Sequence, residues 1–173
     1  MNKENKMREI RVEKLTLNFG AGKEAELLEK GVKLLKIVSG RDPVKTITQK
    51  RIPEWGVRPG LPLGCKLTLR GKDAVELLLR LLKARTNKVK ESSFGAGNFS
   101  FGIPEYIDIP GVKYAPELGI IGFEAAVTLA RPGYRIVSRK VKPKKLPKSH
   151  RITVDETMKF AVEKLGVQIG EPQ

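Results

Sequence analysis

Cysteine and histidine are almost absent from this chain of 173 residues, which contains one of each, Cys65 and His150. A lone cysteine cannot form an internal disulfide, so the composition suits a reducing compartment, and we expect the cytoplasm. No spacing resembles a metal site, and we expect no cofactor. We expect Cys65 to be a small core residue, and His150, which lies in a basic run, to have an electrostatic rather than a catalytic role.

Long hydrophobic runs are also missing. No uninterrupted apolar segment approaches the ~20 residues that a membrane-spanning helix needs. The first residues, MNKENKM, are polar and lack the apolar stretch of a secretory signal. We therefore expect neither a membrane span nor secretion.

Acidic residues are few relative to basic ones. Lys and Arg number 34 and Asp and Glu number 19, which gives a formal net charge of +15 and a pI of about 10.0. A positive field of this kind attracts polyphosphate partners, so nucleic acid is the leading class of partner. Charge alone also fits a general nucleic-acid-packing protein, and this alternative stays open.

Hydrophobic periodicity predicts a mixture of strands and helices. The expected strands cover residues 10–19, 44–48, 65–70, 106–109, 120–130 and 136–140. Apolar stripes predict helices over 23–38 and 73–84, and the T-x-x-E spacing of Thr153 and Glu156 predicts a helix over 153–165. Because the later strands are not joined by regular crossover helices, we expect an α+β fold of two layers, with a mostly antiparallel or mixed sheet and helices packed on one face.

We expect a disordered N-terminus over residues 1–7 and a single domain over 8–173 that carries two basic, irregular segments. Residues 49–64 contain three prolines and three glycines, which predict a long, exposed basic loop. Residues 131–151 contain nine Lys or Arg and no acid. Such a run is solvated and repels itself unless an anionic partner orders it.

The stretch LTLNFGAGKEA, residues 15–25, has the G-x-G-x-x-A spacing of a dinucleotide-binding turn. That site also needs an acid about 20 residues further on, at the end of the second strand. Asp42 lies before that strand instead, so a nucleotide-binding enzyme is the weaker alternative. Two interpretations remain open: Gly20 and Gly22 only turn the chain, or the turn also contacts RNA phosphates through its backbone N–H groups.

Three motifs occur in one order along the chain. They are VEKLTLNFGAG (12–22), a spaced series from Pro43 to Gly71 that ends in GCKLTLRG, and FGAGNFSFGIPEYIDIPG (94–111). Together they resemble the large-subunit ribosomal protein L five family in its archaeal and eukaryotic form, over residues 7–169. RPGYRIVSRK and PKSHR resemble the archaeal branch.

The resemblance implies a structural ribosomal protein that catalyses nothing. Members of the family bind 5S rRNA and neighbouring 23S rRNA in the central protuberance, and they approach the peptidyl-site tRNA with the long loop. A neighbour of the ribosomal L eighteen family and a small-subunit head protein are further implied partners. RNA recognition by shape and 2′-hydroxyl groups suits such a sheet, which has no helix for reading a DNA groove.

The expected contacts fall into two groups. We expect rRNA contacts at Asn18, Arg41, Lys66, Thr68, Arg70, Asn98, Arg135, Arg139 and Lys140, of which Asn18 and Thr68 match positions that the family uses. We expect the tRNA-contact loop to act through Lys50, Arg51, Trp55 and Arg58. Trp55 and Tyr134 are candidates either for stacking on a base or for packing within the protein.

Overall fold

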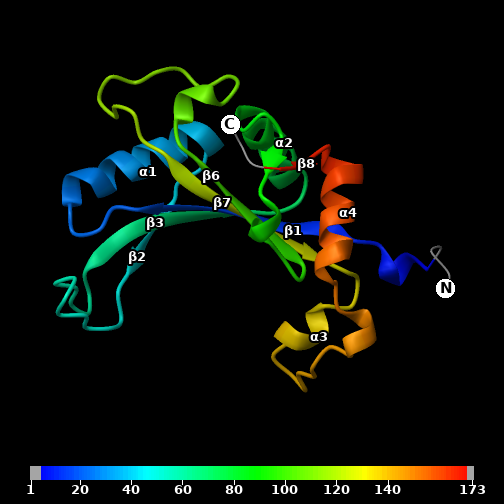
Figure 1. Ribbon diagram of the computed structural model, residues 1–173. Helices are drawn as coiled ribbons and strands as arrows, with labels where there is room; N and C mark the ends of the chain where they lie inside the picture. The colour runs from blue at the N-terminus through cyan, green and yellow to red at the C-terminus, as the bar shows by residue number, and fades with distance from the viewer. Residues whose placement is uncertain (1–4, 171–173) are drawn as a thin grey trace.

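Six strands form one antiparallel sheet in this computed structural model, which describes residues 5–170 (Figure 1). The strand order is β2-β3-β1-β7-β6-β5. The strands are β1 (Arg11–Gly20), β2 (Val44–Ile47), β3 (Pro62–Leu69), β5 (Phe94–Gly95), β6 (Asn98–Ile103) and β7 (Phe123–Ala130). A separate parallel pair consists of β4 (Lys88–Val89) and β8 (Gln168–Ile169).

Helices cover one face of this sheet. The helices α1 (Ala25–Ser39) and α2 (Lys72–Ala84) pack on β3 and β1, and α4 (Val154–Leu165) packs at the β5 edge (Figure 1). Short helical turns are η1 (Lys6–Arg8), η2 (Glu91–Ser93), η3 (Tyr106–Asp108), α3 (Arg135–Ser138) and η4 (Lys148–His150). None of the helices within residues 5–170 has the length and apolar content of a membrane span.

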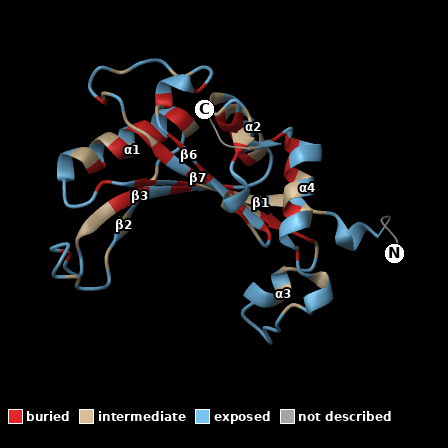
Figure 2. Cartoon of the chain, viewed as in Figure 1, coloured by how far each residue is buried: buried red, intermediate tan, exposed pale blue. Residues whose placement is uncertain are grey.

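The core lies between the sheet and these helices, where the buried residues gather (Figure 2). Leu15, Leu17 and Phe19 alternate with more exposed residues along β1, which is the period of a strand with one buried face. Gly31 of α1 lies directly over the Phe19 ring, and a Cβ at this position would collide with the ring. The glycine therefore allows α1 to approach β1 closely.

The capping box predicted at Thr153 is confirmed. Thr153 Oγ1 accepts a hydrogen bond from the Glu156 backbone N–H at 3.3 Å, and Glu156 Oε2 accepts one from the Thr153 N–H at 3.0 Å. One turn further on, the buried Thr157 Oγ1 accepts a hydrogen bond from Gly97 N–H at 3.0 Å. The start of α4 is thereby joined to the turn between β5 and β6.

The predicted fold class, α+β with a mostly antiparallel sheet, is confirmed. Two predicted strands are wrong: 106–109 forms η3, and 136–140 forms α3 and an extended segment. Tyr106 is fully buried and its hydroxyl bonds Ala115, so this stretch folds on itself, and 136–140 lies beyond the end of β7. β5 and β6 were not predicted, because both strands are short and lie in a glycine-rich stretch, although Phe99, Phe101 and Ile103 alternate with exposed residues.

The sheet order also excludes a dinucleotide-binding fold. β3 lies between β1 and β2, so the two strands that would flank the glycine turn are not neighbours. Asp42 forms an ion pair with Lys36 at 2.7 Å. Gly22 has a φ of 63°, a backbone conformation that favours glycine, so the turn alone accounts for this residue. A phosphate contact at this turn stays a prediction.

β3 begins at Pro62, so the irregular segment expected over 49–64 ends earlier than predicted. Residues 1–4 of the N-terminus expected to be disordered lie outside the described residues, and η1 begins at Lys6. The Asn5 side chain caps this turn by accepting a hydrogen bond from the Met7 N–H at 3.0 Å.

Candidate nucleic-acid interface

The sheet face opposite the helices is lined by short polar side chains. Where Leu15 and Leu17 of β1 point to the core, Thr16 and Asn18 point away from it. The strand register extends this pattern across four strands, since Thr16 pairs with Thr68 on one side and Ala126 on the other. We call this surface the open face: Lys14, Thr16, Asn18, Gly20, Lys66, Thr68, Asn98, Ser100, Gly102, Glu124, Ala126 and Thr128.

The open face has the chemistry of an RNA-binding surface. Its hydroxyl and amide groups can donate to and accept from sugar and phosphate oxygens, and their short side chains allow a backbone to approach the sheet. Lys14 and Lys66 add positive charge. A wide sheet surface of this kind suits RNA, which is recognised by shape and 2′-hydroxyl groups rather than by a helix in a major groove.

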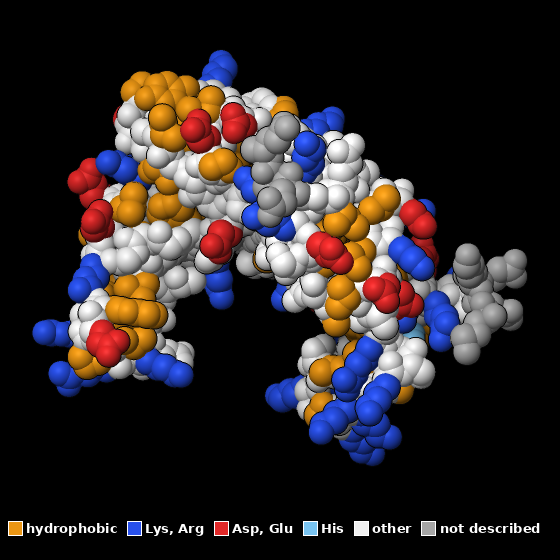
Figure 3. All heavy atoms as spheres, viewed as in Figure 1, with side chains coloured by type: hydrophobic (Ala, Val, Ile, Leu, Met, Phe, Trp, Pro, Cys, Tyr) orange, Lys and Arg blue, Asp and Glu red, His pale blue; other side chains and the backbone are white. Residues whose placement is uncertain are grey.

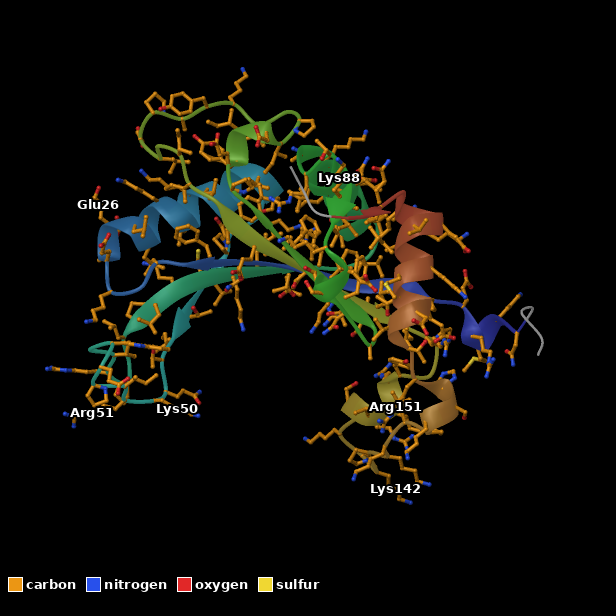
Figure 4. All side chains as sticks on the ribbon, in the orientation of Figure 1. Glu26, Lys50, Arg51, Lys88, Lys142 and Arg151 are labelled. Atoms are coloured by element: carbon orange, nitrogen blue, oxygen red, sulfur yellow. The ribbon has the colours of Figure 1, made fainter. Side chains whose placement is uncertain are left out.

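Two basic segments project from the sheet on the side of the open face, and a wide space separates them (Figures 1 and 3). We call residues 48–61 the hairpin arm and residues 131–151 the basic arm. Lys50 and Arg51 lie in the first, and Lys142 and Arg151 lie in the second (Figure 4). The arms therefore place positive charge on both sides of the open face.

The hairpin arm continues the β2–β3 hairpin. Ile52 and Val57 exchange two backbone hydrogen bonds of 3.0 Å, and Val57 is only 4% exposed, so it anchors the tip. Trp55 is 66% exposed, which leaves its ring accessible for stacking on a base. Lys50, Arg51 and Arg58 are exposed around it.

The basic arm is held by the buried Arg131, which is only 4% exposed. Its guanidinium donates to the backbone carbonyls of Arg8 (3.2 Å), His150 (3.3 Å) and Arg151 (3.2 Å). It also forms an ion pair of 2.7 Å with Glu156, the residue of the α4 capping box. The expectation that the whole run 131–151 is solvated is thus wrong for Arg131, because acceptors distant in sequence gather around it.

Tyr134 and His150 pack together beside this arginine. Their rings meet edge to face with centroids 5.7 Å apart. The Tyr134 hydroxyl donates to His150 O at 3.2 Å and accepts from the Ile152 N–H at 3.0 Å, so Tyr134 is a packing residue. His150 Nε2 lies 3.0 Å from Pro132 O, which gives His150 a structural role in closing the arm.

The pKa of Glu156 is lowered by this arrangement. Partial burial alone acts to raise the pKa, but the Thr153 backbone N–H and the Arg131 guanidinium bond the carboxylate and outweigh it. For Cys65, burial raises the pKa to about 11 against a smaller opposing effect of Lys45. The Cys65 thiol is therefore protonated and buried, as expected of a core residue.

All but one of the expected rRNA-contact residues lie on the open face, at its edge or on the basic arm. Asn18, Lys66, Thr68 and Asn98 lie on the open face, and Arg135, Arg139 and Lys140 are exposed on the basic arm. Arg70 follows β3 and pairs with Glu13 at 3.2 Å.

Arg41 lies elsewhere. It follows the C-terminal end of α1 and pairs with Asp73 of α2, outside the paired rows of the open face. Its contact with rRNA stays a prediction.

Four residues of this surface were not predicted from the sequence: Thr16, Ser100, Glu124 and Thr128. Their alternation with buried residues was present in the sequence of each strand. Only the register of the sheet shows that they share a face. Within residues 5–170, no cluster of three or more His, Cys, Asp or Glu side chains is placed to hold a metal ion.

An open polar sheet face between two cationic arms is the arrangement expected of an RNA-binding protein. The comparisons with known proteins identify the family. The family model described as "Ribosomal protein L5" matches residues 5–58, and a second model, which describes the C-terminus of the same ribosomal protein family, matches residues 62–160. The chain therefore belongs to the L5 family of ribosomal proteins, a structural family without enzymatic activity.

Archaeal relatives support this assignment over nearly the whole chain. The "Large ribosomal subunit protein uL5" of Nanoarchaeum equitans is 53% identical over 167 residues, which cover 96% of this chain and 99% of the relative. Those of Sulfurisphaera tokodaii and Methanobrevibacter smithii are 46% and 42% identical, cover 96% and 94% of this chain, and are each matched over 96% of their own length. The resemblance found in the sequence is confirmed.

Proposed function

We propose that this protein is a structural component of the large ribosomal subunit in the cytoplasm, where it binds 5S rRNA through its open face and neighbouring 23S rRNA in the central protuberance. The observation that carries this proposal is the open face of small polar side chains between two cationic arms. The family assignment supports it, because the relatives are named large-subunit proteins.

The two kinds of surface have different tasks in this proposal. Lys and Arg of the arms contact phosphates and supply affinity that weakens with salt through counterion release. Asn18, Thr68 and their neighbours on the open face hydrogen-bond the RNA and fix its position. Specificity then comes from the fit of one RNA shape to the open face.

We further propose that the hairpin arm contacts the peptidyl-site tRNA. Trp55 is exposed at the tip and has Arg51 and Arg58 nearby in the chain, which combines a stacking ring with positive charge. A neighbour of the L eighteen family and a small-subunit head protein are the protein partners that the family resemblance implies.

The first test is equilibrium binding of 5S rRNA, with tRNA and an unrelated RNA of equal length as competitors, over a series of salt concentrations. We expect 5S rRNA to be preferred by about 4 kcal/mol or more, as specific nucleic-acid sites achieve. Asn18→Ala with Thr68→Ala should reduce the affinity about tenfold or more, because hydrogen bonds are lost. The salt dependence should not change, because neither side chain is charged.

Equal affinity for all three RNAs would contradict the proposal. It would favour the alternative suggested by charge alone, a general nucleic-acid-packing protein. A change in the salt slope of the double variant would also contradict the division of tasks between the arms and the open face.

The hairpin arm has a separate test, the combined Arg51→Ala, Trp55→Ala and Arg58→Ala variant. We expect its affinity for isolated 5S rRNA to stay nearly unchanged. In reconstituted large subunits the variant should weaken the binding of peptidyl-site tRNA by about tenfold, the size of a lost stacking contact. A large loss of 5S rRNA affinity would refute the separate role of this arm.

A further inference from the structure

Two glycines on the open face are required neither by the backbone conformation nor by close packing within the protein. Gly20 and Gly102 lie in β1 and β6, and neither has a positive φ. A Cβ added to either would meet no atom within 4 Å. By contrast, Gly64 and Gly122 lie against backbone oxygens, with which a Cβ would collide. Glycine inside a strand weakens the strand, and one reason for such a glycine is the close approach of a ligand or of another backbone.

Gly20 and Gly102 line one open hollow at the end of the sheet. Its volume is about 500 Å³, within the range of sites that bind small ligands. The hollow is lined by Asn18, Gly20, Gly102, Gly122, Glu124 and Arg85 together with Phe19, Ile103, Pro104 and Phe123. The two unexplained glycines therefore keep the same space free.

The polar groups of this hollow are unusual for a surface that faces phosphate. Glu124 is the one acidic residue in the paired rows of the open face that the structure describes. Asn18 Nδ2 donates to Glu124 Oε2 at 3.4 Å, so the amide and the carboxylate lie side by side. Arg85 Nε is buried and has no hydrogen-bond partner within the described residues.

A carboxylate repels phosphate but accepts hydrogen bonds from a base. Guanine presents two adjacent donors, N1–H and N2–H, next to the acceptor O6. Glu124 offers two acceptor oxygens, and the Asn18 amide offers a donor beside them. The order of donors and acceptors on the guanine edge is thus complementary to that of the Glu124–Asn18 pair. Arg85, which follows the C-terminal end of α2, lines the same hollow and contributes a cation to it.

We infer that this hollow binds one unpaired guanine of the bound RNA, which Glu124 and Asn18 recognise by its Watson–Crick edge over a floor of Gly20 and Gly102. This inference rests on the proposed function, because it assumes that RNA occupies the open face. RNA-binding proteins commonly read splayed, unstacked bases in this way. It makes Glu124 a specificity-determining residue.

The first experiment uses Gly102→Ala, with Gly170→Ala as its matched control. A Cβ meets no atom within 4 Å at either position, so both variants should keep the melting temperature of the wild type. Gly170 lies after β8, outside the hollow. We expect Gly102→Ala to weaken 5S rRNA binding about tenfold or more, because the added methyl group occupies the hollow, and Gly170→Ala to have no effect.

The second experiment uses free nucleotides, so it does not depend on 5S rRNA. The amide signals of Gly102 and Gly122 are followed by NMR during titration with GMP, IMP, AMP and CMP at millimolar concentrations. We expect GMP to bind most tightly and IMP, which lacks the N2 amino group, to bind more weakly. Glu124→Gln should reduce the preference for GMP over AMP by about tenfold, because one acceptor of the pair is lost.

The outcomes separate this inference from the proposed function. Equal shifts with all four nucleotides, or no shift with any, would overturn the guanine site even if wild-type protein prefers 5S rRNA. A preference for GMP combined with unchanged 5S rRNA affinity of Gly102→Ala would mean that the hollow takes a free nucleotide, which also overturns the inference. A preference for GMP in a protein that binds all RNAs alike supports the hollow and contradicts only the proposed function.

Discussion

Ser100→Glu is expected to weaken 5S rRNA binding on the order of a hundredfold, because like charges in an interface cost several kcal/mol. Ser100 lies on the open face in the same row as Thr16, Thr68 and Ala126. It is exposed and paired with Ala126, so a glutamate can point to solvent in the free protein. A carboxylate in the middle of this face meets phosphate when RNA binds.

Ser92→Glu is the matched control. Ser92 is also an exposed serine, but it lies in η2 near α4 rather than on the open face. Both variants change the net charge by the same amount, so a general loss of electrostatic attraction would affect both equally. We expect Ser92→Glu to bind 5S rRNA nearly as well as the wild type. Equal losses in the two variants would show that the open face is not the binding surface.

Arg131→Ala is expected to lower the free energy of unfolding by about 2–4 kcal/mol, because it removes a buried guanidinium and leaves several part-buried acceptors without a partner. The lost contacts are those to the carbonyls of Arg8, His150 and Arg151 and to Glu156. Denaturant unfolding of the free protein measures the effect. Hydrogen exchange should show that amides of the basic arm lose protection before those of the sheet.

Arg135→Ala provides the control for charge. Arg135 is an exposed arginine of the same arm, and no hydrogen bond of its side chain is described. We expect its unfolding free energy to change by no more than about 0.5 kcal/mol, while its affinity for rRNA falls and its salt dependence becomes weaker. If Arg131→Ala is as stable as Arg135→Ala, the buried arginine does not hold the arm.

Lowering the pH should destabilise the folded protein in part as Arg131→Ala does, because protonation of Glu156 weakens its ion pair with Arg131. The pKa of Glu156 is lowered in the folded protein, so the unfolded chain binds its proton more readily. The contribution of Glu156 is therefore complete above the usual carboxyl pKa of 4.5 and is lost as the pH falls through its lower folded-state pKa. Glu156→Gln should flatten this part of the dependence of stability on pH.

Local sequence was sufficient for most of the secondary structure. The apolar stripe of α1, the capping box of α4 and the alternation in β1, β3 and β7 are short-range patterns, and the structure confirms the elements that they predict. The failures share a cause. The short β6 lies in a glycine-rich stretch, and the stretches at Tyr106 and Ile136 look like strands but pair with no strand among residues 5–170. A strand is defined by its partner, which local sequence does not contain.

The sequence by itself determined the charge of this protein, its fold class and, through three ordered motifs, its family. Only the tertiary structure decided which polar residues share a face and why one arginine of the basic run is buried. It also decided which glycines are required neither by the backbone conformation nor by packing within the protein. Arg131 shows the physical cause most directly, because its acceptors come from Arg8, from residues 150–151 and from Glu156. Burial and hydrogen bonding depend on groups that are distant in sequence and meet only when the sheet and the helices pack.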